Sequence, residues 1–447
     1  MKKIIKIIGL LSLLALVVVI YLNYPKLNFI TGFSSKSVCS CTFVADRSLA
    51  SIEAQDNDFS PIDLATNKID FENKSVTSTV FGLKARTAVY KEGLGCILVP
   101  EGSDHTTLTV QPNRNKTPKN KPFPYGDLPQ KDTVFQNIDY SILNKAVINA
   151  FDSEDEQLKR TRAVVVVYKN QIIAEHYADG FNKDTKILGW SMTKSITSAI
   201  VGILEKQGRV STSQSHLFPE WENDDRANLT LNNLLQMNSG LAWEEDYSKI
   251  SDVTKMLFLR ENMPKIPLEK QLIEIPNESW NYSSGTTNLI SGFIRNQFKT
   301  NQAYLDFWYR ELIDKIGMHS MTIETDLKGH FVGSSYGWAT ARDWSKFGLL
   351  YLHNGNWNGE QIFTKDWVEY TKTPTNTSDG IYGAQFWLNA GGRYPDVPKD
   401  LFSCNGYQGQ QVSIIPSKDI VIVRFGLIED PLFSFNTFLS EILSAIN

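Results

Sequence analysis

Two stretches of the chain alternate apolar runs and turn residues in a way that predicts β-hairpins. Residues 163–180, AVVVVYKNQIIAEHYADG, hold two β-branched runs joined by a Lys-Asn-Gln turn. Residues 411–426, QVSIIPSKDIVIVRFG, repeat this arrangement around a proline-containing turn. Helical spacing of apolar residues appears in 139–151, just before the first hairpin, and in 432–446, just after the second. The order helix, hairpin, hairpin, helix therefore brackets a long middle stretch.

That middle stretch is mostly helical in pattern, and no repeat of fixed period runs through it. Sheets built from hairpins are antiparallel, and helices cover one face of such a sheet in α+β proteins. We therefore expect an α+β fold: one antiparallel sheet made from both ends of the region, flanked by its terminal helices, with a helical lobe inserted between the hairpins.

A seam in composition divides the chain. Residues 111–129, QPNRNKTPKNKPFPYGDLP, are rich in Pro, Lys and Asn and poor in apolar residues, as in a linker or a long surface loop. Short β-like runs precede it. We expect an N-terminal anchor or signal over 1–25, an accessory segment with the linker over 26–130, and the main domain over 131–447.

The N-terminus pairs positive charge with an apolar run. Lys2, Lys3 and Lys6 flank IIGLLSLLALVVVIYL, residues 7–22, and no small-residue cleavage site follows. With the preceding isoleucines the segment approaches the roughly 20 residues that cross a bilayer. The sequence predicts an uncleaved N-terminal membrane anchor with the body on the extracytoplasmic side, periplasmic or extracellular; a cleaved signal peptide is the alternative.

Charge and cysteine content narrow the partners. The 447 residues have a net charge of -4 and no basic stripe interleaved with aromatics, which argues against nucleic acid. The six histidines are scattered and the four cysteines lack paired CxxC spacing, so we expect neither a metal site nor a cofactor. In an exported protein a disulfide from Cys39 or Cys41 to Cys96 is expected.

The segment GWSMTKSITSAIVGIL, residues 189–204, carries the candidate chemistry. Ser191 stands at the start of a predicted helix and Lys194 follows at i+3, so the amine can reach the hydroxyl. Helix N–H groups there can also stabilise an oxyanion. A hydroxyl becomes a good nucleophile only when a base takes its proton, which lysine can do if its pKa falls well below about 10.4. By itself this short pattern also fits a capped helix with a surface lysine.

Five motifs in order make the match more specific. The chain resembles serine hydrolases of the class C β-lactamase, D,D-peptidase and family VIII esterase group, nearest to the nylon-oligomer (6-aminohexanoate-dimer) hydrolases, over roughly 135–447. The likeness rests on SMTK (191–194), LLQMNSGLAWEEDY (234–247), NYSSG (281–285), SYGWATARDWSKFGLLYLHNG (335–355) and NGYQGQQ (405–411).

The resemblance implies a role for each matched residue. Ser191 would be the acylated nucleophile, Lys194 its activating partner, and Tyr282 the proton shuttle to the leaving group. The backbone N–H groups of Ser191 and Gln410 would form the oxyanion hole. Tyr247 would contact the scissile amide.

The chain also departs from the β-lactamase pattern. Ser284 replaces the asparagine of Tyr-x-Asn, and Tyr407-Gln408-Gly409 replaces Lys-Thr-Gly. The missing lysine removes the cation that holds a β-lactam carboxylate. We therefore expect acyl transfer on a linear amide or ester. The expected substrate-binding residues are Tyr247, Trp190, Ser284, Tyr407 and Gly409.

Two rival motifs have simpler explanations. GSSYG, residues 333–337, matches G-x-S-x-G with Ser335 as nucleophile, but it lacks the preceding buried strand and a downstream acid and histidine. A loop leading into a helix capped by Thr340 is the better interpretation. Glu244, Glu245 and Asp246 are adjacent in sequence, which is typical of a solvated rim rather than a catalytic pair.

Two functional classes remain. The first is an exported, membrane-tethered serine hydrolase that acts on small amides or esters. The second is a penicillin-recognising or peptidoglycan-binding module with little or no turnover, acting as a sensor or scaffold.

Overall fold

The computed structural model describes residues 2–100, 102–103, 110–153 and 158–447. Two compact units share the chain. The first comprises Met1–Lys91, Cys96–Thr107 and Asp246–Glu261, and the second Glu92–Gly95, Leu108–Glu245 and Asn262–Asn447. We call the second the main unit and describe each unit separately. The domain boundary at residue 130 stays a prediction.

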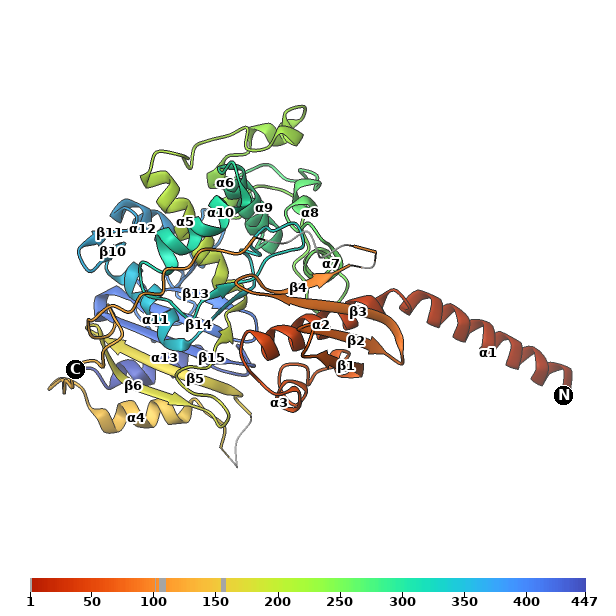
Figure 1. Ribbon diagram of the computed structural model, residues 1–447, viewed down its shortest axis with the longest axis horizontal. Coiled ribbons are helices and arrows are strands. Elements are labelled where there is room, and N and C mark those ends of the chain that lie inside the picture. Colours follow the sequence, from red (N-terminus) through yellow and green to blue (C-terminus); the bar gives the residue numbers. More distant parts are fainter. Residues whose placement is uncertain (1, 101, 104–109, 154–157) are drawn as a thin grey trace. The chain divides into compact units, whose positions relative to one another are not determined.

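A six-stranded sheet forms the centre of the main unit (Figure 1). Every neighbouring pair of strands is antiparallel. In spatial order the strands are β12 (Trp387–Leu388), β13 (Phe402–Gly406), β14 (Gln410–Ile415), β15 (Ile420–Gly426), β5 (Thr161–Tyr168) and β6 (Gln171–Tyr177). The hairpin from the first part of the unit thus pairs with the hairpin from its end through β5 and β15.

Both faces of this sheet are covered, which explains why β5 and β15 are buried along their whole length. Val164, Val166 and Ile422 join a core with α4 (Tyr140–Asn149) and α13 (Phe435–Ser444) on one face. The opposite face packs on α11 (Ala341–Leu352), where a Cβ on Gly348 would lie 2.6 Å from a methyl group of Val421. Residues of a strand alternate between the two faces, so continuous apolar runs suit a sheet that is buried on both sides.

The chain between β6 and β12 is largely helical. Its helices in the main unit are α5 (Thr193–Lys206), α6 (Leu231–Leu235), α8 (Lys265–Leu268), α9 (Ser284–Asn296), α10 (Asn301–Trp308), α11 and α12 (Lys365–Lys372). A small sheet has the strand order β7 (Ile187–Leu188), β9 (Gly337–Ala339), β8 (Thr322–Ile323). Its strand β7 comes before α5 in the chain and β9 comes just before α11, and β10 (Asn356–Trp357) pairs with β11 (Glu360–Gln361). The predicted α+β fold, with a sheet from both ends and an inserted helical lobe, is confirmed.

The first unit is a helix packed on a second antiparallel sheet. Its helix α2 (Lys26–Phe43) packs against the sheet and against α7 (Asp252–Leu259). The strands run in the order β1 (Ala65–Asp70), β2 (Ser75–Val80), β3 (Leu83–Lys91) and β4 (Gly95–Val99). Phe258 of α7 stacks its ring 5.1 Å from that of Phe33, and Gly32 allows the close approach because a Cβ there would lie 2.8 Å from the Phe258 carbonyl oxygen.

The N-terminal residues form α1 (Lys2–Asn23), followed by α2. Among the residues that the structure describes, no helix combines the length and the apolar character that crossing a membrane requires. The structure therefore gives no support to the predicted anchor over 1–25.

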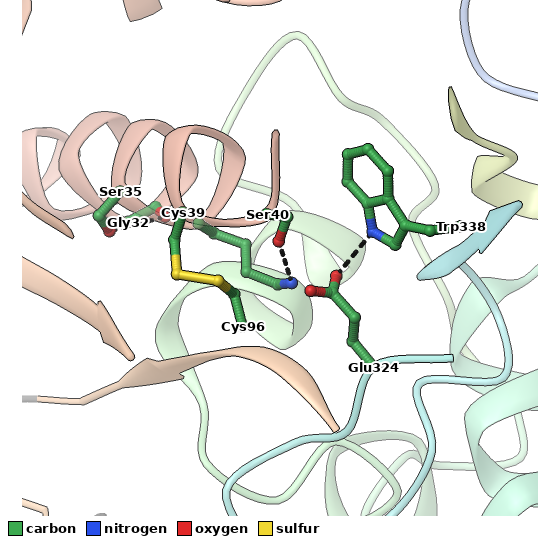
Figure 2. The surroundings of a disulfide bond; sticks show 8 residues. Gly32, Ser35, Cys39, Ser40, Cys96, Glu324 and Trp338 are labelled. Carbon is green, nitrogen blue, oxygen red and sulfur yellow. Dashed lines mark hydrogen bonds between the residues drawn. A yellow bond between two sulfur atoms is a disulfide. The ribbon is translucent and has the colours of Figure 1, made fainter. Parts of the chain in front are cut away.

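A disulfide joins α2 to β4 within the first unit (Figure 2). It links Cys39 to Cys96 across a sequence separation of 57 residues. Cys41, the other candidate, is buried but lies outside the bridge, with the Arg47 guanidinium 3.8 Å from its sulfur. Of the two pairings that the sequence left open, the structure has the one through Cys39.

Loss of this bridge is expected to destabilise the first unit. In the chain-entropy account, a cross-link closing a loop of this length restricts the unfolded chain by about 4 kcal/mol, and measured values are typically about 2–4 kcal/mol. The variant Cys39→Ala/Cys96→Ala should lose a free energy of unfolding of that order in denaturant titration. Cys41→Ala, on the same helix, is the matched control and should lose less. Peptide mapping after thiol trapping in cells should recover Cys39 joined to Cys96; a bridge to Cys41 would contradict the structure.

Candidate active site

The candidate nucleophile lies on a tight turn that enters α5. Ser191 is the middle residue of the 3-10 turn Trp190–Met192 and is 9% exposed. The preceding Trp190 has φ of +46°, in the left-handed region that bulky residues avoid. Two hydrogen bonds hold this turn: Thr193 Oγ1 donates to the Trp190 carbonyl oxygen at 2.7 Å and accepts from the Gly337 N–H at 2.9 Å. The strand β9 therefore fixes the backbone around Ser191.

Lys194 is almost completely enclosed, with 1% of its surface exposed. Its Nζ lies 2.9 Å from Ser191 Oγ, 2.9 Å from Ser284 Oγ and 3.0 Å from the Ser334 carbonyl oxygen. Burial disfavours the charged form and lowers the pKa of Lys194 to about 8, although the carboxylate of Glu245 opposes this shift. At pH 7 roughly one such amine in ten is neutral, against fewer than about one in a thousand for an ordinary lysine.

Behind the lysine lies a carboxylate that sequence reasoning assigned to a solvated rim. Glu245 Oε1 accepts a hydrogen bond from Ser284 Oγ at 2.5 Å, and Oε2 accepts from the Ser284 N–H at 2.9 Å and from Trp243 Nε1 at 2.6 Å. Glu245 is half-buried, whereas its neighbour Glu244 is exposed. Three adjacent acidic residues look alike in sequence, so only the fold distinguishes the one that turns inward.

Ser284 connects this carboxylate to the lysine. It is the first residue of α9 and is fully buried, and its neighbour Ser283 caps the helix by accepting from the Thr286 N–H. The Ser284 hydroxyl accepts from Lys194 and donates to Glu245. Ser191, Lys194, Ser284 and Glu245 thus form one hydrogen-bonded chain.

Tyr282 contacts both Lys194 and Ser191. Its ring centroid lies 4.9 Å from Lys194 Nζ, and a hydrogen bond with Ser191 partly offsets the effect of burial on its hydroxyl. Burial, followed by the charge of Glu245, raises the pKa of Tyr282 well above its usual value. The side chain is therefore a neutral phenol at pH 7, which can donate a proton, rather than a phenolate.

An aromatic wall holds the Tyr282 ring. Its centroid lies 5.2 Å from that of Trp387 and 5.7 Å from that of Tyr382, and Trp280 packs on both of these. The apolar surroundings explain why the phenol keeps its proton. Trp280 directly precedes the motif NYSSG in sequence, whereas Tyr382 and Trp387 come from a distant segment that no matched motif includes.

The second predicted oxyanion donor, Gln410, begins β14 after a turn in which Gln408 and Gly409 have φ of +62° and +78°. This turn lies against the nucleophile turn, because Trp190–Met192 packs on β13 and β14. The Gln410 side chain is committed elsewhere: its Nε2 donates to the Gly426 carbonyl oxygen at 2.6 Å and its Oε1 accepts from the Gly426 N–H at 3.1 Å. Any contribution of Gln410 to acyl chemistry therefore comes from its main chain.

The remaining predicted contacts fall into two groups. Trp190 packs edge-on against Tyr407, with centroids 5.7 Å apart, so both border the nucleophile turn, and Gly409 lies in the turn before Gln410. Tyr247 belongs to the segment Asp246–Glu261 of the first unit, and its contact with a scissile amide stays a prediction.

Ser335, the candidate nucleophile of the rival motif GSSYG, is part of the packed interior. It is fully buried and its Oγ lies 2.8 Å from Ser334 Oγ. The segment then forms β9, and Thr340 Oγ1 caps α11 by accepting from the Asp343 N–H at 3.2 Å, as the sequence predicted. GSSYG nevertheless contributes to the site, because the Ser334 carbonyl oxygen binds Lys194. In the described part of the chain, no three His, Cys, Asp or Glu residues cluster as metal ligands would.

Comparisons with known proteins identify the family of this chain. The profile of the family described as beta-lactamase matches residues 151–428, more than half of the chain. A 6-aminohexanoate-dimer hydrolase from Paenarthrobacter ureafaciens is 23% identical over 296 residues, which span 61% of this chain and 74% of that protein.

Solved structures show the same fold at low sequence identity. A family VIII carboxylesterase is 13% identical with a TM-score of 0.54, and 68% of this chain aligns with 96% of that one. A penicillin-binding protein homolog from Caulobacter crescentus is 14% identical with a TM-score of 0.52, over 69% of this chain and 97% of that one. Because the matched profile covers the segments that carry Ser191, Lys194 and Tyr282, the chain belongs to the beta-lactamase family of serine hydrolases.

Proposed function

We propose that this protein is an exported hydrolase that cleaves small linear amides or esters through an acyl-enzyme on Ser191. The observation that carries the proposal is the enclosed Lys194 amine, 2.9 Å from Ser191 Oγ, with its pKa lowered to about 8 by burial. A lysine in this state can remove the serine proton near neutral pH.

Acylation then proceeds in balanced steps. Ser191 Oγ attacks the substrate carbonyl carbon while its proton passes to neutral Lys194. The oxyanion that forms is stabilised by the backbone N–H groups of Ser191 and Gln410. Tyr282 donates its phenolic proton to the departing amine or alkoxide and regains one from the Lys194 ammonium, so the carbonyl–leaving-group bond breaks and Lys194 returns to its neutral form.

Deacylation reverses these roles. Water attacks the acyl carbonyl and gives its proton to Lys194, directly or through Tyr282. The tetrahedral intermediate collapses, the bond to Ser191 Oγ breaks, and that oxygen takes the proton back. The products are a carboxylic acid and the starting enzyme.

Glu245 and Ser284 adjust the lysine for this cycle. The carboxylate stabilises the ammonium that forms during attack, and Ser284 transmits the interaction through its two hydrogen bonds. Without Glu245 the neutral amine would be more abundant but a weaker base. The pair therefore places the pKa between that of a free lysine and that of a fully desolvated one.

The substrate class follows from what the site lacks and from its relatives. Tyr407 stands where a β-lactamase has a lysine, and Ser284 is occupied by Lys194 and Glu245. The names of two relatives, a 6-aminohexanoate-dimer hydrolase and a family VIII carboxylesterase, also support an amide or ester substrate. Export is supported by the Cys39–Cys96 disulfide, since such bridges persist in oxidising compartments.

A fluorophosphonate probe should label Ser191. Its phosphorus accepts the activated serine oxygen, so labelling requires the Ser191–Lys194 pair. Ser191→Ala should abolish labelling, measured by gel fluorescence and by mass spectrometry of the modified peptide. Ser335→Ala is the matched control and should keep the label. Labelling that survives the first change and disappears with the second would reverse the assignment.

The pH profile should report Lys194. We expect kcat/KM for a p-nitrophenyl ester to rise with pH through an inflection near 8, where the neutral amine becomes dominant. Because Glu245 raises the pKa of Lys194, Glu245→Gln should move this inflection to lower pH. Glu244→Gln, the exposed neighbour, should leave it in place. An inflection that stays fixed in Glu245→Gln would remove Glu245 from the proposed mechanism.

Turnover separates the hydrolase from a penicillin-recognising or peptidoglycan-binding module. A hydrolase should release product from p-nitrophenyl esters or linear amide dimers over many cycles, with kcat/KM at least about tenfold above that for nitrocefin, since the cation for a β-lactam carboxylate is missing. A single burst equal to the enzyme concentration, followed by no further release with any ester, amide dimer or D-amino-acid peptide, would favour the binding module.

A further inference from the structure

A second buried cation lies beneath the oxyanion turn. Arg424, on β15, is 1% exposed and uses all five of its N–H donors. Nη1 donates to the carbonyl oxygens of Gly409 at 2.9 Å and Ile428 at 2.7 Å. Nη2 donates to the Lys159 carbonyl oxygen at 2.8 Å and to Thr161 Oγ1 at 3.0 Å, and Nε donates to the same hydroxyl at 3.1 Å. The acceptors in these five bonds are carbonyl and hydroxyl oxygens.

The contact with Gly409 bears on catalysis because of covalent geometry. The carbonyl of Gly409 and the N–H of Gln410 belong to one peptide group. In a planar trans peptide the C=O and N–H point in opposite directions. A guanidinium fixed on the oxygen of this peptide therefore sets the direction of the Gln410 N–H. It also polarises the peptide, and a polarised peptide is a stronger hydrogen-bond donor.

The surroundings are shaped to admit the guanidinium. A Cβ on Gly409 would lie 2.5 Å from Nη1, and one on Gly426 would lie 2.3 Å from the central carbon, so glycine is required at both positions. On a third side the Phe433 ring centroid lies 4.0 Å from that carbon. Burial lowers the pKa of Arg424 to about 9. Desolvating this charge costs free energy that the neutral acceptors and the carboxylates of Asp152, Asp430 and Glu429 offset only in part, which argues for a purpose other than holding the sheet together.

The turn itself is held from other directions too. The backbone N–H groups of Gln408 and Gly409 donate to the Glu429 carboxylate. Burial raises the pKa of Glu429, and these two hydrogen bonds partly offset that rise. The Gln410 side-chain amide donates to the Tyr407 carbonyl oxygen at 3.0 Å. Among these contacts the one from Arg424 engages the peptide that carries the predicted oxyanion donor.

We propose that Arg424 is a positioning residue of the oxyanion hole, which orients and polarises the Gly409–Gln410 peptide from the side opposite the substrate. This inference rests on the proposed function, since it assigns the Gln410 N–H to the developing oxyanion. It extends that function by naming a buried arginine, which lies outside every matched motif, as the group that strengthens the Gln410 N–H as a hydrogen-bond donor.

Kinetics provide the first test. Arg424→Lys keeps the charge but loses the planar fork. We expect kcat for a p-nitrophenyl ester to fall by about 10- to 100-fold, less than the roughly 10²–10³-fold loss from deleting an oxyanion donor, while KM changes little. Arg114→Lys is the matched control: Arg114 makes a similar fork to Asp314 and the Met321 carbonyl oxygen, none of which is assigned a part in the acyl chemistry, and its variant should keep kcat. A rise in KM with unchanged kcat would contradict the proposal.

An activity-independent measurement addresses the peptide directly. Gly409–Gln410 is the one Gly–Gln pair in the sequence, so carbonyl-¹³C glycine with ¹⁵N glutamine isolates a single amide signal. The Gln410 amide proton should shift upfield in Arg424→Lys, because its peptide is less polarised, and should stay in place in Arg114→Lys. Should Arg424→Lys fail to fold, Thr161→Val removes two of the guanidinium's bonds more gently and should cause a smaller shift of the same sign.

The outcomes separate the two proposals. A fixed Gln410 signal in a folded Arg424 or Thr161 variant, with Ser191 still labelled by fluorophosphonate, overturns the role of Arg424 and leaves the proposed function intact. Absence of Ser191 labelling in the unaltered protein overturns the proposed function. The movement of the Gln410 signal then still decides whether Arg424 polarises this peptide.

Discussion

The arrangement of the site depends on the burial of the Lys194 amine. Lys194 is useful as a base only because the fold removes it from water, and a lysine exposed at the same position would hold its proton at neutral pH. Enclosure is costly unless the N–H groups find acceptors, and here two hydroxyls and a carbonyl oxygen supply them. The start of α9, the start of α5 and the loop before β9 must therefore meet around a single nitrogen atom.

The site combines two electrostatic strategies. Around the lysine, desolvation is tempered by one nearby carboxylate, so the proton can move in either direction during a cycle. Around Arg424, desolvation is countered by backbone oxygens, by the Thr161 hydroxyl and by the charges of acidic side chains, and the charge stays in place. The first arrangement suits a group that exchanges protons and the second a group that supplies a fixed field.

Much of this fold was predictable because hydrophobic periodicity is a local property. The hairpins around β5 and β15 and the helices α4 and α13 follow from spacing alone, and the Ser191–Lys194 pair follows from one helical turn. Glu245 and Arg424 could not be found this way, since their roles depend on segments that meet only in three dimensions. The choice between Cys39 and Cys41 stayed open for a related reason: two residues apart on a helix they face nearly opposite directions, and the sequence did not predict α2.

The left-handed backbone at Trp190 has a consequence for attempts to stabilise the protein. Glycine is the residue that adopts a φ of +46° without steric cost, so a search guided by folding energy alone would select position 190 for replacement. The same change would release the ring that packs on Tyr407 and loosen the turn that presents the nucleophile. Thermostability and reactivity therefore pull in opposite directions at this residue, and engineering for robustness is better directed at positions distant from the turn.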